Sequence, residues 1–594
     1  MARESGADTI ERAAPVTYTG AREKGWAMSE ANVPRRISLL WPAGTPPAAQ
    51  TGLSERSLRD LDCATIVRAF SAERAHHEAI THLLAALCAD PAVIRYRQEV
   101  LEDLLRYPAL QACFRELLPR IDVLGYLPNL GGERPSLYEV TWRAGELENL
   151  VQCVYALGET FRSVGGGLMS AGLRAWRDTV ARLARDDTFQ ALARELPDLL
   201  TRLRAVRSIT VGVNLDQQLR PVEATLVAVN KEKFRSASLL DRLFGGTAGE
   251  LTGLGPLHGV PAYVQELGEV KPQMVPLFRD LSDVLEKISR PVARALRRYA
   301  SVNGDFLVGL RGELRFYLGA MEMIQRLTAH GLPMCRPEIL PPEARACEIA
   351  DCYNVNLALH LIGEGQHDDL GDVIVRNDVA IGPQGRIIIL TGPNQGGKTT
   401  YMQGIGLAQV LAQAGLYVPG SRARISPVDA IYTHYPVEER LDQGTGRFGD
   451  EARRLSDIFG QATRHSLLLL NESLSSTSAG ESLYLAQDVV RILRMMGTRA
   501  VFVTHLHELA AAVDDLNAHT PGDSQIVSLV SSVISAGDSP DEGGTARRSF
   551  KVVPSPPIGR SYAHELATRY GVSFQQLTDL LKKRGILEHD PDDE

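Results

Sequence analysis

The fold is decided by the stretch Ile387-Ile-Ile-Leu-Thr-Gly-Pro-Asn-Gln-Gly-Gly-Lys-Thr-Thr400, in which an apolar strand, a glycine-rich turn and a helix start follow one another. Glycines allow successive backbone N–H groups to point into such a turn, and the helix N-terminus adds partial positive charge. In this pattern Lys398 reaches the β- and γ-phosphates of a nucleotide and Thr399 holds Mg²⁺. The pattern also arises by chance, but the strand before it and the helix after it, which ends near Gly415, favour a nucleotide-binding loop.

Two further apolar runs place polar side chains where parallel strands of the same sheet would end. Ser466–Leu470 leads into Asn471 and Glu472, and Ala500–Val503 leads towards His505. Hydrolysis of a nucleotide needs a group that orients water and groups that meet the developing charge. Glu472 therefore predicts a water-polarising carboxylate and His505 a contact to the γ-phosphate. The alternative, that Asn471 and Glu472 simply begin a helix, fits the preceding apolar run less well.

The composition sets broad limits on the class of protein. A chain of 594 residues is too long for one core, and 44% apolar with 23% charged residues is ordinary for a soluble protein. The net charge of −8 neither indicates nor excludes a nucleic-acid partner. The seven cysteines form no C-x-x-C pair or zinc spacing, which favours reduced thiols. Because no apolar run is long enough to span a bilayer and no leader pattern is visible, we expect a cytoplasmic protein without a membrane partner.

The periodicity of apolar residues changes along the chain. Helical spacing runs through Asp62–Leu87 and Leu173–Leu203, and again through a long segment from Pro276 to about Leu327. Between these segments, Ser208–Leu215 and Ala224–Asn230 alternate as the two strands of a hairpin would. After residue 337, strands and helices alternate, which predicts an α/β sheet covered by helices.

Several motifs together resemble the ATPase domain of the MutS family of DNA mismatch-repair proteins. They are Thr391–Met402, Tyr417–Pro419, Ile425–Tyr432, Leu468–Ser478 and Val503–Leu509, with Ser549–Val553 and Gly559–Ala563 resembling the family's last strand and helix. The resemblance is strong over residues 337–585. It is weak over residues 56–336, where only the order of helices, small β excursion and returning helix is similar.

The resemblance implies a fold and a division into domains. The fold would be an α/β P-loop ATPase domain of the ABC type at the C-terminus, preceded by a mainly helical core and lever with a small β-containing clamp. The expected units are a disordered arm (1–55), core and lever (56–205), clamp (206–240), returning lever helices (241–336), ATPase domain (337–585) and an acidic tail (586–594).

The resemblance also assigns roles to individual residues, with ATP and Mg²⁺ as the implied ligands. Lys398, Glu472 and His505 would be catalytic, with Glu472 as the base and His505 as the γ-phosphate sensor. Thr399 and Asn471 would be on the metal side. The nucleotide would be bound by Gly392, Pro393, Asn394, Gln395, Gly396, Gly397, Lys398, Thr399 and Thr400, with Ile374, Val375 and Asn377 at the adenine.

The sequence departs from the family pattern in ways that bear on function. Asn471 stands where the family has an aspartate, which removes one negative charge from the Mg²⁺ site and predicts slower turnover. The family's two glycines after the glutamate are replaced in Ser473-Leu-Ser-Ser476. Gly446 stands where a family serine reaches the partner's nucleotide, and Arg447 or Thr445 is the alternative residue for that contact. Residues 1–55 are too short for the family's mismatch-reading and connector domains, and they contain no aromatic-x-Glu wedge, so we expect no direct mismatch recognition.

These features predict a MutS-like ATPase whose hydrolysis of ATP opens and closes a dimeric, non-sequence-specific DNA clamp in DNA repair or recombination. The dimer partner would be a second copy or a related MutS-like subunit. The first alternative is a slow nucleotide-gated scaffold that binds proteins rather than DNA. The second, an SMC-like or transporter-type ABC ATPase, is disfavoured because the chain shows neither a long heptad coiled coil nor a membrane segment.

Overall fold

A computed structural model of the 594-residue chain describes residues 37–45, 52–124, 137–205, 208–215, 217–218, 221–232, 290–365, 369–436, 446–534, 547–555, 571–584 and 586. Several predicted segments lie outside these ranges: the arm before residue 37, Pro276 to residue 289, Gly559–Ala563 and the acidic tail. Among the described helices, none has the length and apolar character required to cross a bilayer.

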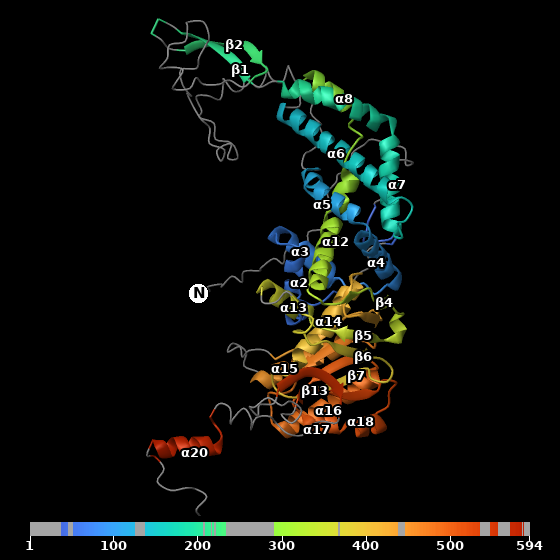
Figure 1. Cartoon of the computed structure of the whole chain (residues 1–594), viewed down its shortest axis with the longest axis vertical. Helices are drawn as coiled ribbons and strands as arrows, with labels where there is room; N and C mark the ends of the chain where they lie inside the picture. The colour runs from blue at the N-terminus through green and yellow to red at the C-terminus, as the bar shows by residue number, and fades with distance from the viewer. Residues whose placement is uncertain are drawn as a thin grey trace, which may run out of the picture. The chain divides into compact units, whose positions relative to one another are not determined.

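Within the described residues, six strands form the sheet that carries the glycine-rich loop after Thr391 (Figure 1). Their order is β10 (Ile431–His434), β11 (Leu467–Asn471), β12 (Arg499–Val503), β7 (Ile387–Thr391), β13 (Ile526–Ile534) and β14 (Arg547–Pro554). All neighbours are parallel except β13 and β14, which are antiparallel. Because parallel strands end at one edge, the residues after β7, β11 and β12 come together there.

Helices cover both faces of this sheet, which explains why its strands are almost continuously apolar. Alternate residues of β7 enter different cores: Ile388 and Leu390 join the cluster that includes α14 (Lys398–Gln413). Ile387 and Ile389 join the cluster on the other face. That second cluster draws on α15 (Gly446–Gln461), α16 (Ala479–Met496), α17 (His507–Ala511) and α18 (Val513–His519).

Short strands from before and after the loop form two further small sheets. A second sheet, in the described residues, has the order β4 (Glu338–Ile339), β9 (Arg422–Ile425), β5 (Cys347–Cys352) and β6 (Asn377–Ile381). A small two-stranded pairing joins β3 (Met334–Cys335) to β8 (Val418–Pro419). Helix α13 (Val355–Gly363) lies between β5 and β6 in the chain and begins at Asn354, whose side chain caps it.

The N-terminal described region is helical. Its elements are α1 (Glu55–Asp60), α2 (Cys63–Phe70), η1 (Arg74–His76), α3 (His77–Ala85), α4 (Pro91–Arg106), α5 (Pro108–Val123), α6 (Leu137–Val164), α7 (Ala171–Arg185), α8 (Asp187–Arg204) and α12 (Asp305–Ala329). A separate helix, α20 (Phe574–Lys583), lies near the C-terminus.

Two helices that the sequence predicts as continuous are broken in the structure. The prediction of one helix over Asp62–Leu87 is wrong, because the backbone turns extended at Ser71, after α2. Gly319 of α12 approaches so closely there that a Cβ would lie 2.4 Å from the Phe70 carbonyl oxygen. The prediction of one helix over Leu173–Leu203 is also wrong, because Asp186 ends α7 and caps α8 by accepting a hydrogen bond from the Phe189 N–H.

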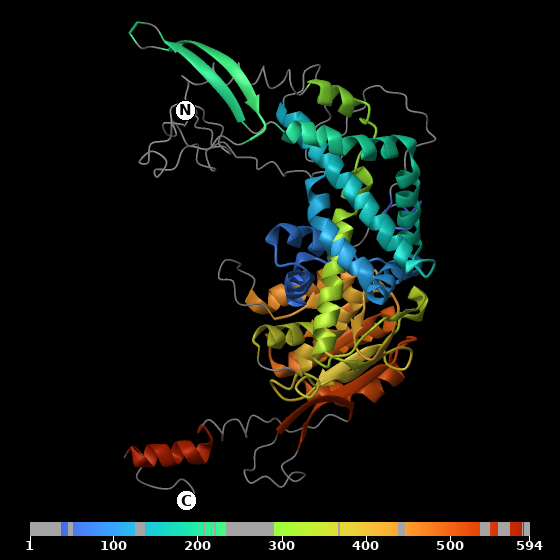
Figure 2. The ribbon, with the colours of Figure 1, turned by 45° about the horizontal axis from the view of Figure 1, so that its top comes forward.

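Strands β1 (Ser208–Leu215) and β2 (Pro221–Asn230) form the antiparallel hairpin that the alternating pattern predicts (Figure 2). Helix α12 begins directly after Gly304 and packs against α2, α4 and α5.

Polar contacts join the helical region to the six-stranded sheet and to α14. Asp60, at the end of α1, accepts a hydrogen bond from the Thr433 hydroxyl at 2.7 Å, and its carbonyl accepts one from Gln403 of α14 at 2.9 Å. The Ser57 hydroxyl donates to the Ile431 carbonyl at 3.0 Å. The helix that follows the glycine-rich loop is therefore held directly against the helical region.

Candidate functional site

The glycine-rich loop joins β7 to α14 at the sheet edge where the parallel strands end. Gly392 has φ +138° and Gly397 has φ +84°, values that side-chain-bearing residues rarely adopt. A Cβ on Gly392 would lie 2.9 Å from Ser531 of β13, so glycine is also required for space. The loop can therefore follow its tight path only with these glycines.

Lys398, the first residue of α14, is folded back over the loop. Its Nζ donates hydrogen bonds to the carbonyl oxygens of Gly392 at 3.0 Å and Pro393 at 2.9 Å, and the residue is only 5% exposed. Burial lowers the pKa of Lys398, and the negative charge of Glu472 opposes this shift. The ammonium group is thus held at the mouth of a loop of backbone amides, where an anion of the size of a phosphate could replace the two carbonyls as its partner.

The two residues predicted on the metal side are in direct contact. Thr399 Oγ1 donates to Asn471 Oδ1 at 3.2 Å, across the gap between α14 and the end of β11. In the described part of the chain, no three His, Cys, Asp or Glu side chains converge as a metal cage. A hydroxyl and an amide oxygen suit Mg²⁺, which takes few protein ligands and relies on phosphate oxygens and water for the rest. The donor set therefore fits Mg²⁺ together with a nucleotide.

Glu472 and His505 form a pair at the ends of β11 and β12. His505 Nε2 lies 2.9 Å from Glu472 Oε1, and both side chains are partly exposed. The hydrogen bond from His505 lowers the pKa of Glu472, and the charges of His505 and Lys398 add to this effect against the cost of burial. Glu472 is therefore an ionised carboxylate near neutral pH, as a base requires.

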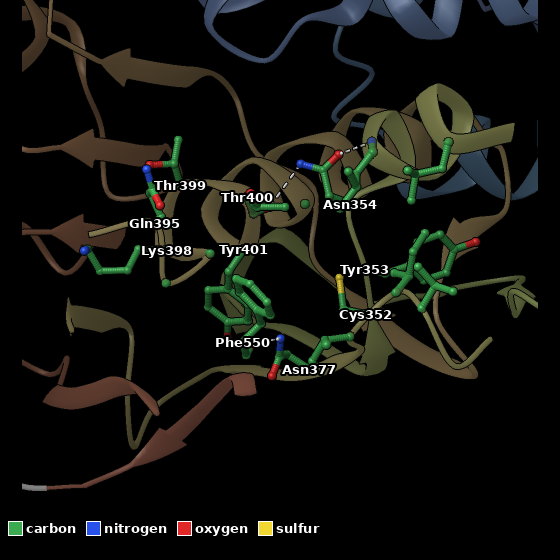
Figure 3. Close-up of a pocket in the computed structure, with 18 of the residues that line it drawn as sticks. Cys352, Tyr353, Asn354, Asn377, Gln395, Lys398, Thr399, Thr400, Tyr401 and Phe550 are labelled. Atoms are coloured by element: carbon green, nitrogen blue, oxygen red, sulfur yellow. Dashed lines mark hydrogen bonds between the residues drawn. The ribbon is translucent and has the colours of Figure 1, made fainter. Parts of the chain in front are cut away.

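A cavity of about 360 Å³ opens beside the loop. Figure 3 shows Lys398 and Thr399 at one end of the cavity and Cys352 and Tyr353 at the other. Its lining includes these predicted residues: Ile374, Val375, Asn377, Asn394, Gln395, Gly396, Gly397, Lys398, Thr399, Thr400 and Glu472. Gly392, Pro393, Asn471 and His505 contact residues of this group without lining the cavity.

Asn377, predicted at the adenine, has both ends of its amide engaged. Nδ2 donates to the Phe550 carbonyl at 3.1 Å, and Oδ1 accepts from the Val552 N–H at 2.9 Å (Figure 3). These bonds fasten the start of β6 to β14 and hold Phe550, which has φ +53°, at the cavity. In this structure Asn377 shapes the cavity wall through Phe550 instead of presenting a free amide.

Three residues that support the loop and cavity are not predicted from the sequence. The buried Ser531 hydroxyl donates to the Gly396 carbonyl, and Phe550 contributes to the lining. Asn354 donates to the Thr400 carbonyl at 3.1 Å while its Oδ1 caps α13. Only Asn354 carries a local signal, since asparagine before an apolar run is a typical helix cap.

The position predicted for the contact to a partner's nucleotide is described only in part. Gly446 is the first residue of α15, but the structure does not describe its side-chain environment or that of Arg447. Thr445 lies outside the described residues. The replacement of the family's serine therefore stays a prediction.

Comparison with known proteins bears on both halves of the chain. The family model of MutS domain V, which is the ATPase domain, matches residues 388–535, and that of the MutS2 N-terminal domain matches residues 89–330. A DNA mismatch repair protein MutS from Chlorobium limicola is 26% identical over 485 residues, which are 74% of this chain and 52% of that protein.

Two other relatives match shorter parts of the chain. A DNA mismatch repair protein Msh6 from Gallus gallus is 33% identical over 30% of this chain and 14% of its own length. An Endonuclease MutS2 from Thermus thermophilus is 36% identical over 23% of this chain and 16% of its own length. The chain thus spans about half the length of the first of these relatives and less of the others. With one family model on the helices and another on the sheet that carries the cavity, the chain belongs to the MutS family.

Proposed function

We propose that this protein is a MutS-like, Mg²⁺-dependent ATP hydrolase whose cycle opens and closes a dimeric DNA clamp. It would act in DNA repair or recombination without reading mismatches itself. One observation carries the proposal: the buried Lys398 ammonium lies over a glycine-rich loop, and the ionised Glu472 lines the same cavity. Such a loop binds a phosphate chain, and a carboxylate beside it can take a proton from water.

Each residue of the site has a part in this reaction. Lys398 exchanges its two loop carbonyls for phosphate oxygens and offsets their charge. Glu472 orients the attacking water and accepts its proton. His505, now paired with Glu472, can instead donate to the γ-phosphate, so the pair would separate when nucleotide binds. Mg²⁺, when held by Thr399 and Asn471, neutralises phosphate charge.

The Mg²⁺ side of the site gives a first prediction. Asn471→Asp keeps the oxygen that accepts from Thr399 and adds one negative charge. We expect the Mg²⁺ concentration for half-maximal hydrolysis to fall roughly five- to tenfold, because a carboxylate attracts the cation more strongly than an amide does. A Mg²⁺ titration of ATPase activity measures this. An unchanged requirement for Mg²⁺ would mean that Asn471 does not face the metal.

The ABC-type fold, the domain boundaries and the dimer belong to the same proposal. They are supported by the match to MutS domain V and by the hairpin and long helix α12 within the helical half. Dimerisation would bring a second copy, or a related MutS-like subunit, to the nucleotide. ATP binding would then bias the dimer between open and closed arrangements.

The DNA part of the proposal is supported by a cleft in the helical region. A cleft of about 400 Å³ between α6 and α7 is lined by Arg162, Arg177, Arg182 and Arg185, with Asp178 as its one acidic residue among the described lining. Asp178 is already paired with Arg177 at 3.0 Å. Guanidinium groups match the geometry of phosphate oxygens, and such contacts bind a DNA backbone without reading its sequence.

A charge reversal in this cleft gives a second prediction. The double variant Arg162→Glu and Arg182→Glu should bind duplex DNA at least tenfold more weakly and shift the salt dependence by about one unit of slope per lost contact. Fluorescence anisotropy at several salt concentrations measures both quantities. The matched control is Arg194→Glu with Arg202→Glu, exposed arginines of α8 outside the cleft. Equal loss in both variants would indicate a general charge effect and no site in the cleft.

The second candidate function is a slow, nucleotide-gated scaffold that binds proteins. Two features favour it. Asn471 leaves the Mg²⁺ site with one negative charge fewer than an aspartate would give, and the run Ser473-Leu-Ser-Ser476 replaces the family's glycine-containing one after Glu472. ATPase rates with plain, mismatched and branched DNA separate the two functions. Stimulation by any DNA form supports the clamp, whereas slow turnover with no stimulation and no salt-dependent DNA binding supports the scaffold.

A further inference from the structure

The segment directly after Glu472 has an unusual backbone. Glu472 has φ +48° and Leu474 has φ +66°, although neither is glycine. Side-chain-bearing residues keep such a conformation only where surrounding contacts hold them in it, and this happens most often at functional sites. The contacts that hold residues 473–476 are therefore contacts that set the direction of the Glu472 carboxylate.

His434 holds the beginning of this segment. It is the last residue of β10, which pairs with β11, and it is 1% exposed. Its Nδ1 lies 2.7 Å from Ser473 Oγ and its Nε2 lies 3.3 Å from the Glu451 carbonyl oxygen. A carbonyl can only accept, so Nε2 carries the hydrogen and Nδ1 accepts from the Ser473 hydroxyl.

The charge state of His434 agrees with this assignment. Burial lowers the pKa of His434 to about 4, and the positive charges of Arg454 and Arg56 act in the same direction. The imidazole is therefore neutral near pH 7 and has one N–H. Both of its nitrogens are then used, one as a donor and the other as an acceptor.

Glu451 holds the other end of the segment. It lies on α15, is 3% exposed, and accepts a hydrogen bond at its Oε1 from the Ser476 hydroxyl at 2.6 Å. Its backbone carbonyl is the same one that accepts from His434. Ser482 adds a bond from its hydroxyl to the Leu474 carbonyl at 2.7 Å.

We propose that His434 and Glu451 are positioning residues, and that they clasp Ser473 and Ser476 so that Glu472 points at the attacking water. This inference rests on the proposed ATP hydrolase function. It also accounts for the sequence departure at this place, because both serine hydroxyls that the clasp uses occur in Ser473-Leu-Ser-Ser476, the run that replaces the family's glycine-containing one. A further consequence is that α15 is linked to the catalytic carboxylate, so a movement of α15 changes the orientation of Glu472.

The clasp is tested by Ser473→Ala and Ser476→Ala, with Ser475→Ala as the matched control. Ser475 lies in the same segment but is exposed. We expect kcat to fall about tenfold in each clasp variant, because orientation of the catalytic group is lost, while the affinity for a nucleotide analogue stays within about twofold. Thermal melting of each variant separates this from a loss of folding. The control should retain the rate of the unmodified protein.

A second measurement tests the contact between His434 and Ser473 without relying on ATP hydrolysis. Nitrogen NMR of the histidine rings should show His434 as the Nε2–H tautomer, with an Nδ1 resonance that shifts in Ser473→Ala and on binding of a non-hydrolysable ATP analogue. Clasp variants that hydrolyse ATP at the original rate, or a His434 signal that ignores both changes, would overturn the inference. If the unmodified chain binds nucleotide but does not hydrolyse it, the proposed ATP hydrolase function is wrong. The clasp is then tested by the analogue-induced shift of the His434 resonance alone.

Discussion

Replacing Lys398 with alanine should abolish high-affinity nucleotide binding. The ammonium is buried above the loop, where its present partners are the carbonyls of Gly392 and Pro393. A nucleotide would replace these neutral partners with charged phosphate oxygens. Each hydrogen bond between charged groups contributes about 1.5–3 kcal/mol, so the loss of two lowers affinity roughly 100-fold or more. Titration with a fluorescent ATP analogue measures the change.

The control for this variant is Lys583→Ala, which removes an equal charge from the exposed end of α20. Because Lys398 also bridges its own loop, melting curves of the nucleotide-free proteins must accompany the titration. A folded Lys398→Ala protein that binds ATP as tightly as the unmodified chain would remove the basis for the proposed site. The same result in both lysine variants would point to a general charge effect.

The central strands of the sheet could be predicted because their signal is local. Each of β7, β11 and β12 contains a run of four apolar residues, and a strand buried on both faces needs such a run. Because parallel strands end at the same edge of a sheet, Lys398, Glu472 and His505 can be placed together there even when the strand order is not known. The close contacts of Glu472 with His505 and of Thr399 with Asn471 agree with that expectation.

Other parts of the site depend on contacts between distant segments, which leave no local pattern. Ser531 lies more than a hundred residues from the loop whose Gly396 carbonyl it bonds, and one serine in a strand is indistinguishable from a solvated one. Phe550 reaches the cavity only because Asn377 fastens β14 at that point. The helix break after Phe70 has the same origin, since it is where Gly319 of α12 approaches.

Glu472→Gln should bind ATP normally and hydrolyse it about 100- to 10,000-fold more slowly, because the glutamine cannot accept a proton from water. The glutamine keeps an oxygen that can accept from His505, so the geometry of the pair is preserved. Single-turnover assays with radiolabelled ATP should then show a stable complex with uncleaved nucleotide. Glu508→Gln, a nearby exposed carboxylate on α17, is the matched control and should hydrolyse ATP at the original rate.

The trapped complex also distinguishes the base from its neighbours. The hydrogen bond from His505 lowers the pKa of Glu472, so the carboxylate stays ionised to a lower pH than an ordinary glutamate does. Glu472→Gln should therefore lower the rate at every pH at which Glu472 is ionised, and any fall of the rate in acid that comes from protonation of Glu472 should be absent from the residual activity. Normal hydrolysis by Glu472→Gln would assign the base elsewhere. A rate that falls together with ATP affinity would instead mean that Glu472 supports the loop through Lys398, whose charge it faces.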